Sequence, residues 1–307
     1  MGILLHVDPK QPPMFWDDYR KTMPGNHIAI DGFVYGAPKK DLKGPWANFN
    51  HHEEVDRTCT RSTCAQVLVA IRQGLPQSFK PNGPIPLIID ANDCDEDVDL
   101  TVYLLRHMAH AKSVINPALN RLVHMEDMYD ATAGSYPYPP ELPILGQLAW
   151  IFDPYRRFRT SGEIDKKVAS SYEAVIDEVG HRIDDHLMGR GQSLDLDITY
   201  DRIGGGKGWV MIREIGAQAK MGMFADGHTA YLSVRQRPDG RYTYVAGKTD
   251  YDPMDLIRAF ELLNIAEGCT TSDCWGGGNM VGGSPRVAGS KLSPEEVGRI
   301  LDEARLS

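Results

Sequence analysis

The adjacent histidines His51 and His52 constrain the fold of this chain more than any other feature. Neighbouring side chains alternate faces on a strand and diverge by about 100° on a helix, so two adjacent imidazoles can serve one site only from a loop at a strand end. An apolar helical pattern opens downstream at Ser62 and Thr63, and the segment 86–90 has the pattern of a buried strand. The sequence therefore predicts a loop that could aim both imidazoles at one metal ion.

Strand and helix patterns alternate through the first half of the chain. Strands are predicted over 27–32 and 86–90, and helices are predicted over 63–73 and 98–109. Such alternation is typical of a parallel sheet with helices packed on its faces. We therefore expect an α/β fold, in which an N-terminal parallel-sheet domain is followed by a smaller C-terminal α+β domain.

A proline-rich segment over 135–143 favours a stiff, extended connector near the middle of the chain. After it, apolar residues at helical spacing predict a long helix over 163–188 that bridges the two halves. The later strand patterns cover 209–214, 218–224, 229–236 and 242–246. The expected divisions are a metal-binding α/β domain at 1–140, a linker with the bridging helix at 141–190, and an anion-binding α+β domain at 191–307.

The charge balance bounds the class of partner. The chain of 307 residues has 33 basic and 42 acidic side chains, which gives a formal net charge of −9. This balance argues against a nucleic acid polymer or an anionic membrane as the partner, while a local basic pocket for a small anion remains compatible with it. The N-terminus lacks a basic region before a long apolar run, so we expect no signal peptide, no membrane span and a cytoplasmic location. A homodimer is also compatible with the sequence.

The cysteines allow two interpretations. Cys59 and Cys64 have the same spacing as Cys269 and Cys274, and the two pairs could bind zinc if they converge. The alternative, which we favour, is a set of reduced and partly buried thiols.

Acidic residues gather over 90–97, directly after the strand predicted at 86–90. Ligands collect beyond the carboxyl ends of parallel strands, so these carboxylates could share a metal ion with His51 and His52. The other interpretation is a solvated acidic turn that precedes a helix. Asp127, on a predicted helix with His124, is an outside candidate for a supporting position around the metal.

A glycine-rich segment at 275–291 is the third candidate. Its small residues let backbone amides approach an anion, and Arg286 and Lys291 add positive charge. The alternative is a glycine-rich strand connection that carries surface basic residues. We favour an anion pocket.

Taken in order, these motifs resemble the DHH phosphoesterase family. The resemblance is carried by Asn-His-His at 50–52, Ser-Thr-Cys-Ala-Gln-Val at 62–67, a strand ending in Asp90, and Gly-Gly-Ser-Pro-Arg-Val-Ala-Gly at 282–289. Asp31 begins a segment similar to the family's first Asp-x-Asp motif. The chain departs from the family pattern at Phe33 and Asn50, where the family has aspartates, and at Ser284, where it has histidine.

The resemblance implies a metal-dependent hydrolase of a small phosphoester or phosphoanhydride, acting at a cleft between two domains. The implied ion is manganese, with iron or zinc as alternatives, and His51 and His52 would be catalytic. The implied metal ligands are Asp31, His51, His52, Asp90 and Asp93. The implied substrate-binding residues are Gly282, Gly283, Ser284, Arg286 and Lys291. The alternatives are a DHH-like anion-binding or regulatory protein that has lost catalysis, or a different metal-dependent chemistry on the same scaffold.

Overall fold

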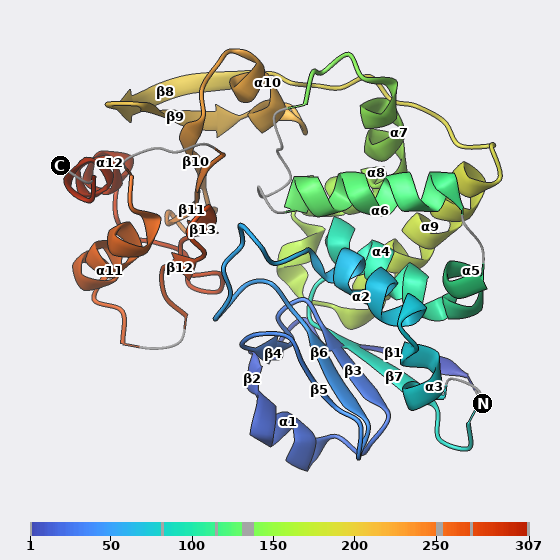
Figure 1. The fold of residues 1–307 in the computed structure, drawn as a ribbon. Coiled ribbons are helices and arrows are strands. Elements are labelled where there is room, and N and C mark those ends of the chain that lie inside the picture. The colour runs from blue at the N-terminus through green and yellow to red at the C-terminus, as the bar shows by residue number, and fades with distance from the viewer. Residues whose placement is uncertain are drawn as a thin grey trace. The chain divides into compact units, whose positions relative to one another are not determined.

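The computed structural model describes residues 2–80, 83–113, 116–130, 138–249, 254–270 and 273–305 (Figure 1). The described residues divide into two compact units. Unit 1 comprises the described parts of 1–55, 59–130 and 143–194, and unit 2 comprises those of 56–58, 131–142 and 195–307. A mainly parallel sheet in unit 1 and a separate mixed sheet in unit 2, each packed with helices, confirm the predicted α/β fold.

Unit 1 is built on a five-stranded sheet with the order β1-β7-β3-β6-β5. Its strands are β1 (Ile3–Val7), β3 (His27–Ile30), β5 (Lys39–Asp41), β6 (Trp46–Phe49) and β7 (Leu87–Ala91). All neighbours pair in parallel except β5 and β6. Most residues of the central strands are buried because helices or loops cover both faces of the sheet, which is usual for parallel sheets. The predicted strands at 27–32 and 86–90 are thus confirmed as β3 and β7.

Helices cover the two faces of this sheet unequally. In Figure 1, α1 (Trp16–Thr22) lies on one side and most of the other helices lie on the opposite side. Tyr19 of α1 packs with Ala29 of β3 and with β4 (Val34–Tyr35), which pairs with β2 (Met14–Phe15). The remaining helices of the unit are α2 (Thr63–Arg72), α3 (Leu75–Phe79), α4 (Glu96–Arg106), α5 (Met108–Ser113), α6 (Pro117–Asp130), α7 (Pro143–Ile151), α8 (Asp153–Thr160) and α9 (Ala169–Leu187).

The long helix expected to bridge the domains belongs to unit 1. It begins at Ala169 rather than near 163, because a 3₁₀ turn at Glu163–Lys166 ends at Lys167 in the left-handed region (φ 52°). Its apolar stripe, which includes Tyr172, Val179 and Ile183, is buried in unit 1, where α9 packs on α4, α7 and α8. No described helix, α9 included, is long and apolar enough to cross a membrane.

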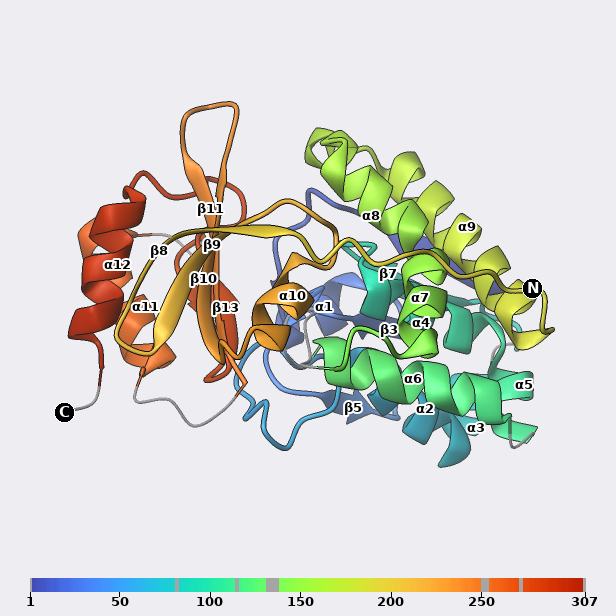
Figure 2. The same ribbon diagram turned by 90° about the horizontal axis from the view of Figure 1, so that it is seen from above.

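Unit 2 holds a six-stranded sheet with the order β12-β13-β11-β10-β9-β8. Its strands are β8 (Tyr200–Gly206), β9 (Trp209–Glu214), β10 (Ala230–Gln236), β11 (Tyr242–Lys248), β12 (Gly276–Gly277) and β13 (Val281–Gly283). Helices α11 (Leu256–Glu267) and α12 (Pro294–Glu303) cover one face, and α10 (Ala219–Ala225) covers the other (Figure 2). The strand predicted at 218–224 is therefore wrong, since this segment is α10. Ala219–Phe224 is buried all round, so its sequence carries no alternation that separates helix from strand.

The cysteines are all free thiols. Cys59 and Cys64 lie in unit 1, whereas Cys269 and Cys274 lie in unit 2. Among the described residues, no group that could hold a metal ion contains a cysteine.

Candidate metal centre

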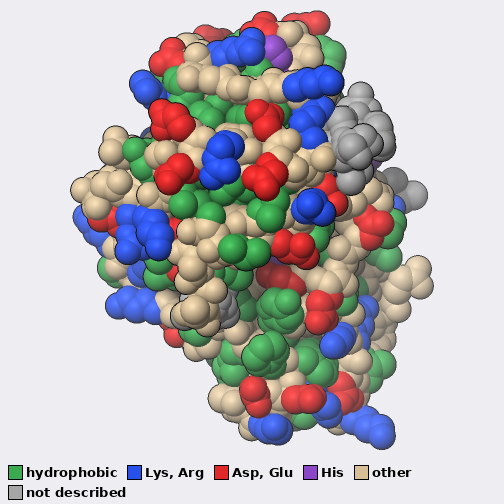
Figure 3. All heavy atoms as spheres, turned by 90° about the vertical axis from the view of Figure 1, so that its left-hand side faces the viewer, with side chains coloured by type: hydrophobic (Ala, Val, Ile, Leu, Met, Phe, Trp, Pro, Cys, Tyr) green, Lys and Arg blue, Asp and Glu red, His purple; other side chains and the backbone are tan. Residues whose placement is uncertain are grey.

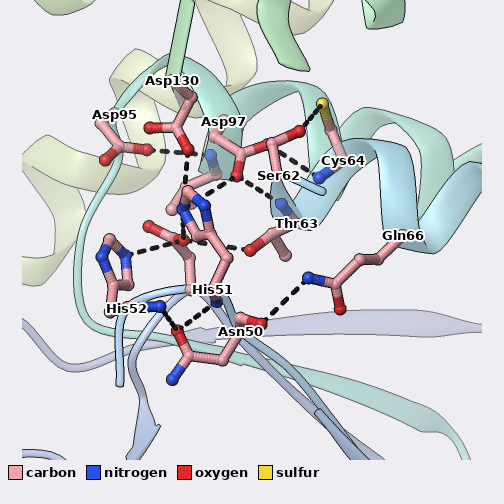
Figure 4. Close-up of polar contacts among 12 residues, drawn as sticks. Asn50, His51, His52, Ser62, Thr63, Cys64, Gln66, Asp95, Asp97 and Asp130 are labelled. Atoms are coloured by element: carbon pink, nitrogen blue, oxygen red, sulfur yellow. Dashed lines mark hydrogen bonds and ion pairs between the residues drawn. The ribbon is translucent and has the colours of Figure 1, made fainter. Parts of the chain in front are cut away.

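Polar side chains from five elements meet at the carboxyl edge of the unit 1 sheet (Figure 4). Asp31 follows β3, and His51 and His52 follow β6, which pairs with β3 in parallel up to Ile30 and Phe49. Two helices begin at this edge, α2 and α4, and α6 ends there. The carboxyl ends of parallel strands and the N-termini of the helices that follow them lie at the same edge of a sheet, so segments distant in the sequence can form a single centre here.

Asn50 shapes the loop that presents the two imidazoles. Its side-chain oxygen accepts hydrogen bonds from the backbone N–H groups of His51 (2.8 Å) and His52 (3.1 Å). Its amide nitrogen donates to the carbonyls of Val34 (3.2 Å) and Gly36 (3.1 Å). The fully buried amide therefore acts as a scaffold, and it places both rings in a loop at a strand end, as the sequence predicts.

Asp31, His51 and His52 form the first group that could hold an ion. The Asp31 Oδ1 atom lies 3.0 Å from His52 Nε2 and 3.4 Å from His51 Nε2. Asp31 has a positive φ of 46°, in the left-handed region that non-glycine residues seldom adopt. Backbone strain of this kind persists where the surrounding structure fixes a functional side chain.

The second group contains His51, Asp97 and Asp130. His51 Nε2 lies 2.7 Å from Asp130 Oδ2 and 3.9 Å from Asp97 Oδ2. The Asp97 carboxylate accepts the backbone N–H groups of Thr63 and Cys64, both at 2.7 Å, in the first turn of α2. Helix N-termini favour negative charge, so α2 anchors Asp97 beside His51. The two groups share the Nε2 atom of His51.

Burial and mutual repulsion govern the protonation of these carboxylates. Burial, together with the nearby negative charges of Asp130 and Asp31, raises the pKa of Asp97 to about 7. Burial and the charges of Asp31 and Asp93 also hold the pKa of Asp95 well above its usual range. For Asp31, burial acts upward, but His52 and His51 outweigh it and hold the pKa well below its usual range. The centre thus contains more negative charge than its own cations neutralise.

This donor set fits a metal ion. Imidazole nitrogens combined with carboxylate oxygens suit manganese, iron and zinc. In each group the candidate ligand atoms all lie within 4.8 Å of one another. The structure therefore contains Asp/His groups in unit 1 that could hold a metal ion, as the sequence predicts.

Two of the predicted ligands lie elsewhere. Asp90 is fully buried, and its carboxylate binds His6 Nδ1 (2.8 Å), His27 Nδ1 (2.8 Å) and Tyr19 Oη (2.7 Å) instead of joining either group. Asp90 lies inside β7, where its side chain points to the face covered by α1. Asp93 accepts the backbone N–H of Cys94 at 2.8 Å and also belongs to neither group. The carboxylates that join Asp31 and the histidines in the two candidate groups are Asp97 and Asp130.

Asp130 and Asp97 were missed as ligands although the sequence holds partial signals for both. Asp97 lies in the acidic run, two residues after the Asp95 N-cap, whose carboxylate accepts the Val98 N–H at 3.0 Å. Asp130 ends the helix that carries Asp127, the outside candidate. Asp127 accepts the backbone N–H of Ser62 at 2.7 Å and so supports the start of α2, while its expected place around a metal ion stays a prediction.

The glycine-rich segment lies in unit 2. Gly282 and Gly283 are in β13, where a Cβ on Gly282 would lie 2.5 Å from the Phe260 ring and one on Gly283 would lie 2.4 Å from the Tyr244 carbonyl. Both glycines therefore permit close packing. The buried Ser284 hydroxyl accepts the Tyr244 N–H at 3.0 Å, while Arg286 and Lys291 are exposed.

Comparison of the chain with protein-family models and with curated proteins finds no match.

Proposed function

We propose that unit 1 binds a divalent cation, manganese in the first instance, and that the protein is a metal-dependent hydrolase of a small phosphoester or phosphoanhydride. The observation that supports this most is the sharing of one imidazole nitrogen, His51 Nε2, by Asp31, Asp97 and Asp130. Three carboxylates beside one imidazole carry more negative charge than the two histidines neutralise, and a divalent cation would offset that excess. The motif order that resembles DHH phosphoesterases supports the same assignment.

We assign the roles of the metal-centre residues from the burial of their side chains. Asp31, His51, Asp97 and Asp130 would hold the ion, which would lower the pKa of a water molecule and neutralise charge on a phosphoryl oxygen. His51 is 1% exposed and serves as a ligand. The His52 side chain is 16% exposed and faces Asp31, which orients its ring. We assign His52 to proton transfer with the leaving group, in addition to any contact with the ion.

A small anion suits the charge distribution better than a polymer. On the face shown in Figure 3, basic and acidic side chains are intermingled rather than gathered into one basic surface. Together with the net charge of −9, this favours local contacts from Arg286 and Lys291 of unit 2 with a phosphate group.

The second candidate is a DHH-like anion-binding or regulatory protein that lacks catalysis. Asn50 favours this second candidate, because its neutral side chain occupies the position at which the DHH phosphoesterase family has an aspartate. Metal content separates the two candidates, since an active hydrolase of this kind retains its ion. If an ion is retained but phosphoesters are not cleaved, amide hydrolysis or redox chemistry at iron becomes the alternative.

The test begins with elemental analysis of protein purified without a metal-affinity tag. It continues with a phosphoester screen with and without manganese. His51→Asn should abolish metal binding and the associated thermal stabilisation, which amounts to about 2.7 kcal/mol at a free metal concentration near 100 times Kd. His110→Asn, an exposed change on α5, is the matched control. A His51→Asn protein that binds and responds to manganese as the wild type does would refute the metal assignment.

The role of unit 2 is tested separately. Arg286→Ala should raise KM for the phosphoester by about tenfold while metal content stays unchanged, because one charged hydrogen-bonding group is removed. Unaltered kinetics would remove Arg286 from the substrate site and leave the unit 1 assignment intact.

A further inference from the structure

In unit 2, the turn at Pro285–Gly289 already binds a carboxylate. Asp273 Oδ1 accepts the backbone N–H of Val287 at 3.1 Å, and Asp273 Oδ2 accepts the backbone N–H of Ala288 at 2.7 Å. Each carboxylate oxygen thus takes one of two consecutive N–H groups. Consecutive backbone N–H groups aimed at one point form an anion-binding concavity, which phosphate and carboxylate oxygens occupy in the same way.

Positive charge surrounds this turn. Arg237 donates to the Val287 carbonyl at 3.1 Å, and Arg241 donates to the Ala288 carbonyl at 3.2 Å. Arg286, within the turn, is exposed. Arg237 contacts the carbonyl edge of the peptide whose other edge carries the Ala288 N–H, so Arg237 and Arg241 brace the turn and add positive charge to its neighbourhood rather than to the N–H pair itself.

The turn is also held by hydrogen bonds that do not involve Asp273. The Gly289 N–H donates to the Pro285 carbonyl at 3.0 Å and closes the turn, and Gly289 adopts a φ of 67°, which glycine accepts without strain. The segment that follows is fixed by Glu267, which is 8% exposed and accepts the Ser290 hydroxyl and the Lys291 N–H. Glu267 is thus an interior brace, whereas Asp273 is half-buried and its partners Val287 and Ala288 are exposed.

We propose that the Pro285–Gly289 turn is an oxyanion site that Asp273 keeps closed in the absence of ligand. A phosphate group, or a carboxylate of similar geometry, binds by displacing the Asp273 side chain from the Val287 and Ala288 N–H groups. Asp273 then acts as an internal competitor that sets the affinity for the external anion. This deepens the proposed function, because it rests on the glycine-rich segment as the anion-binding part and adds a means of regulating it.

The direction in which a single substitution changes the affinity for phosphate tests the proposal. Binding of inorganic phosphate to the full-length chain is measured by calorimetry in the presence of a metal chelator, at constant ionic strength. If Asp273 competes with the ligand, Asp273→Asn should bind phosphate on the order of tenfold more tightly, because the charged competitor is gone. If Asp273 only braces the turn, the same change should leave the affinity unaltered or weaken it, and either result overturns the proposal.

Controls separate local from general effects. Asp201→Asn removes one exposed carboxylate on β8 of the same unit and should leave the affinity near that of the wild type. A parallel titration with acetate distinguishes a site for carboxylates from one that prefers phosphate. In the wild type, the Val287 and Ala288 amide resonances should shift on phosphate addition, and this readout needs no variant. Because the assay excludes metal, its failure would leave the unit 1 metal centre untouched.

Discussion

Unit 1 contains two clusters built from aspartate and histidine side chains, and they differ in the ratio of carboxylates to histidines. In the Asp90 network, one buried carboxylate receives hydrogen bonds from His6, His27 and Tyr19. In the His51 centre, the proportion is reversed, since Asp31, Asp97 and Asp130 all face a single imidazole nitrogen. The first cluster sets one carboxylate against two histidines, whereas the second sets three carboxylates against two histidines.

The difference shows how to tell a structural Asp/His cluster from a metal centre. A buried carboxylate is stable when its lone pairs are occupied, and three donors achieve this for Asp90. Buried carboxylates that outnumber the positive charges beside them either take up protons or bind a cation. The pKa of Asp97, raised to about 7 by burial and by Asp130 and Asp31, reflects that choice. The ratio of carboxylates to positively charged partners, rather than the presence of histidine and aspartate, therefore marks the candidate site.

The largest effect that would sharpen this comparison comes from Asp90→Asn. The change removes the charge that three donors surround, so the free energy of unfolding should fall by about 3–5 kcal/mol, measured by chemical denaturation. Manganese binding by the folded fraction should not change. Asp18→Asn, an exposed change on α1, is the control for loss of one charge. If Asp90→Asn instead lost the metal and kept its stability, Asp90 would be a ligand, as the sequence predicts.

The elements themselves follow from local patterns. The apolar runs of β3 and β7 and the periodic residues of α2 and α4 carry their structure in neighbouring positions, so they were predicted closely. The loop at His51 and His52 was also predictable, because adjacent side chains can share a site only from irregular backbone. These features depend on a few residues that are close in the sequence.

The identity of the centre's carboxylates was less accessible. Asp90 and Asp97 lie in the same acidic run, and only the strand that contains Asp90 and the helix that contains Asp97 decide which face each reaches. Asp130 reaches His51 through the packing of α6, a contact between segments distant in the chain. Sequence periodicity records which face of an element a residue occupies and does not record which other element meets that face. The charge excess at His51 therefore became visible only in three dimensions.

A pH titration of metal-free protein probes the excess of negative charge at the His51 centre. Asp97 has a pKa of about 7 in the folded protein, against an ordinary value of 3.8, so the unfolded chain releases this proton first as the pH rises. Stability should therefore fall between about pH 5.5 and pH 7, by about 2 kcal/mol if Asp97 titrates alone. Manganese replaces the proton, so its stabilising effect should grow over the same range. Thermal melts with and without manganese measure both, and a metal-free stability that rises with pH would contradict the repulsion inferred here.

The smallest expected effect is that of Asn50→Asp, and it separates the scaffold from the ligands. The Asn50 amide nitrogen faces three acceptors, which are the carbonyls of Val34 and Gly36 and the carboxylate of Glu53 at 2.8 Å. An aspartate cannot donate to them, so the free energy of unfolding should fall by about 1–2 kcal/mol and manganese binding should weaken as the His51–His52 loop loses its support. If residue 50 were instead a vacant ligand position, the added carboxylate would tighten manganese binding. Calorimetry with manganese decides between the two outcomes. Tighter binding would add residue 50 to the possible ligand positions around His51.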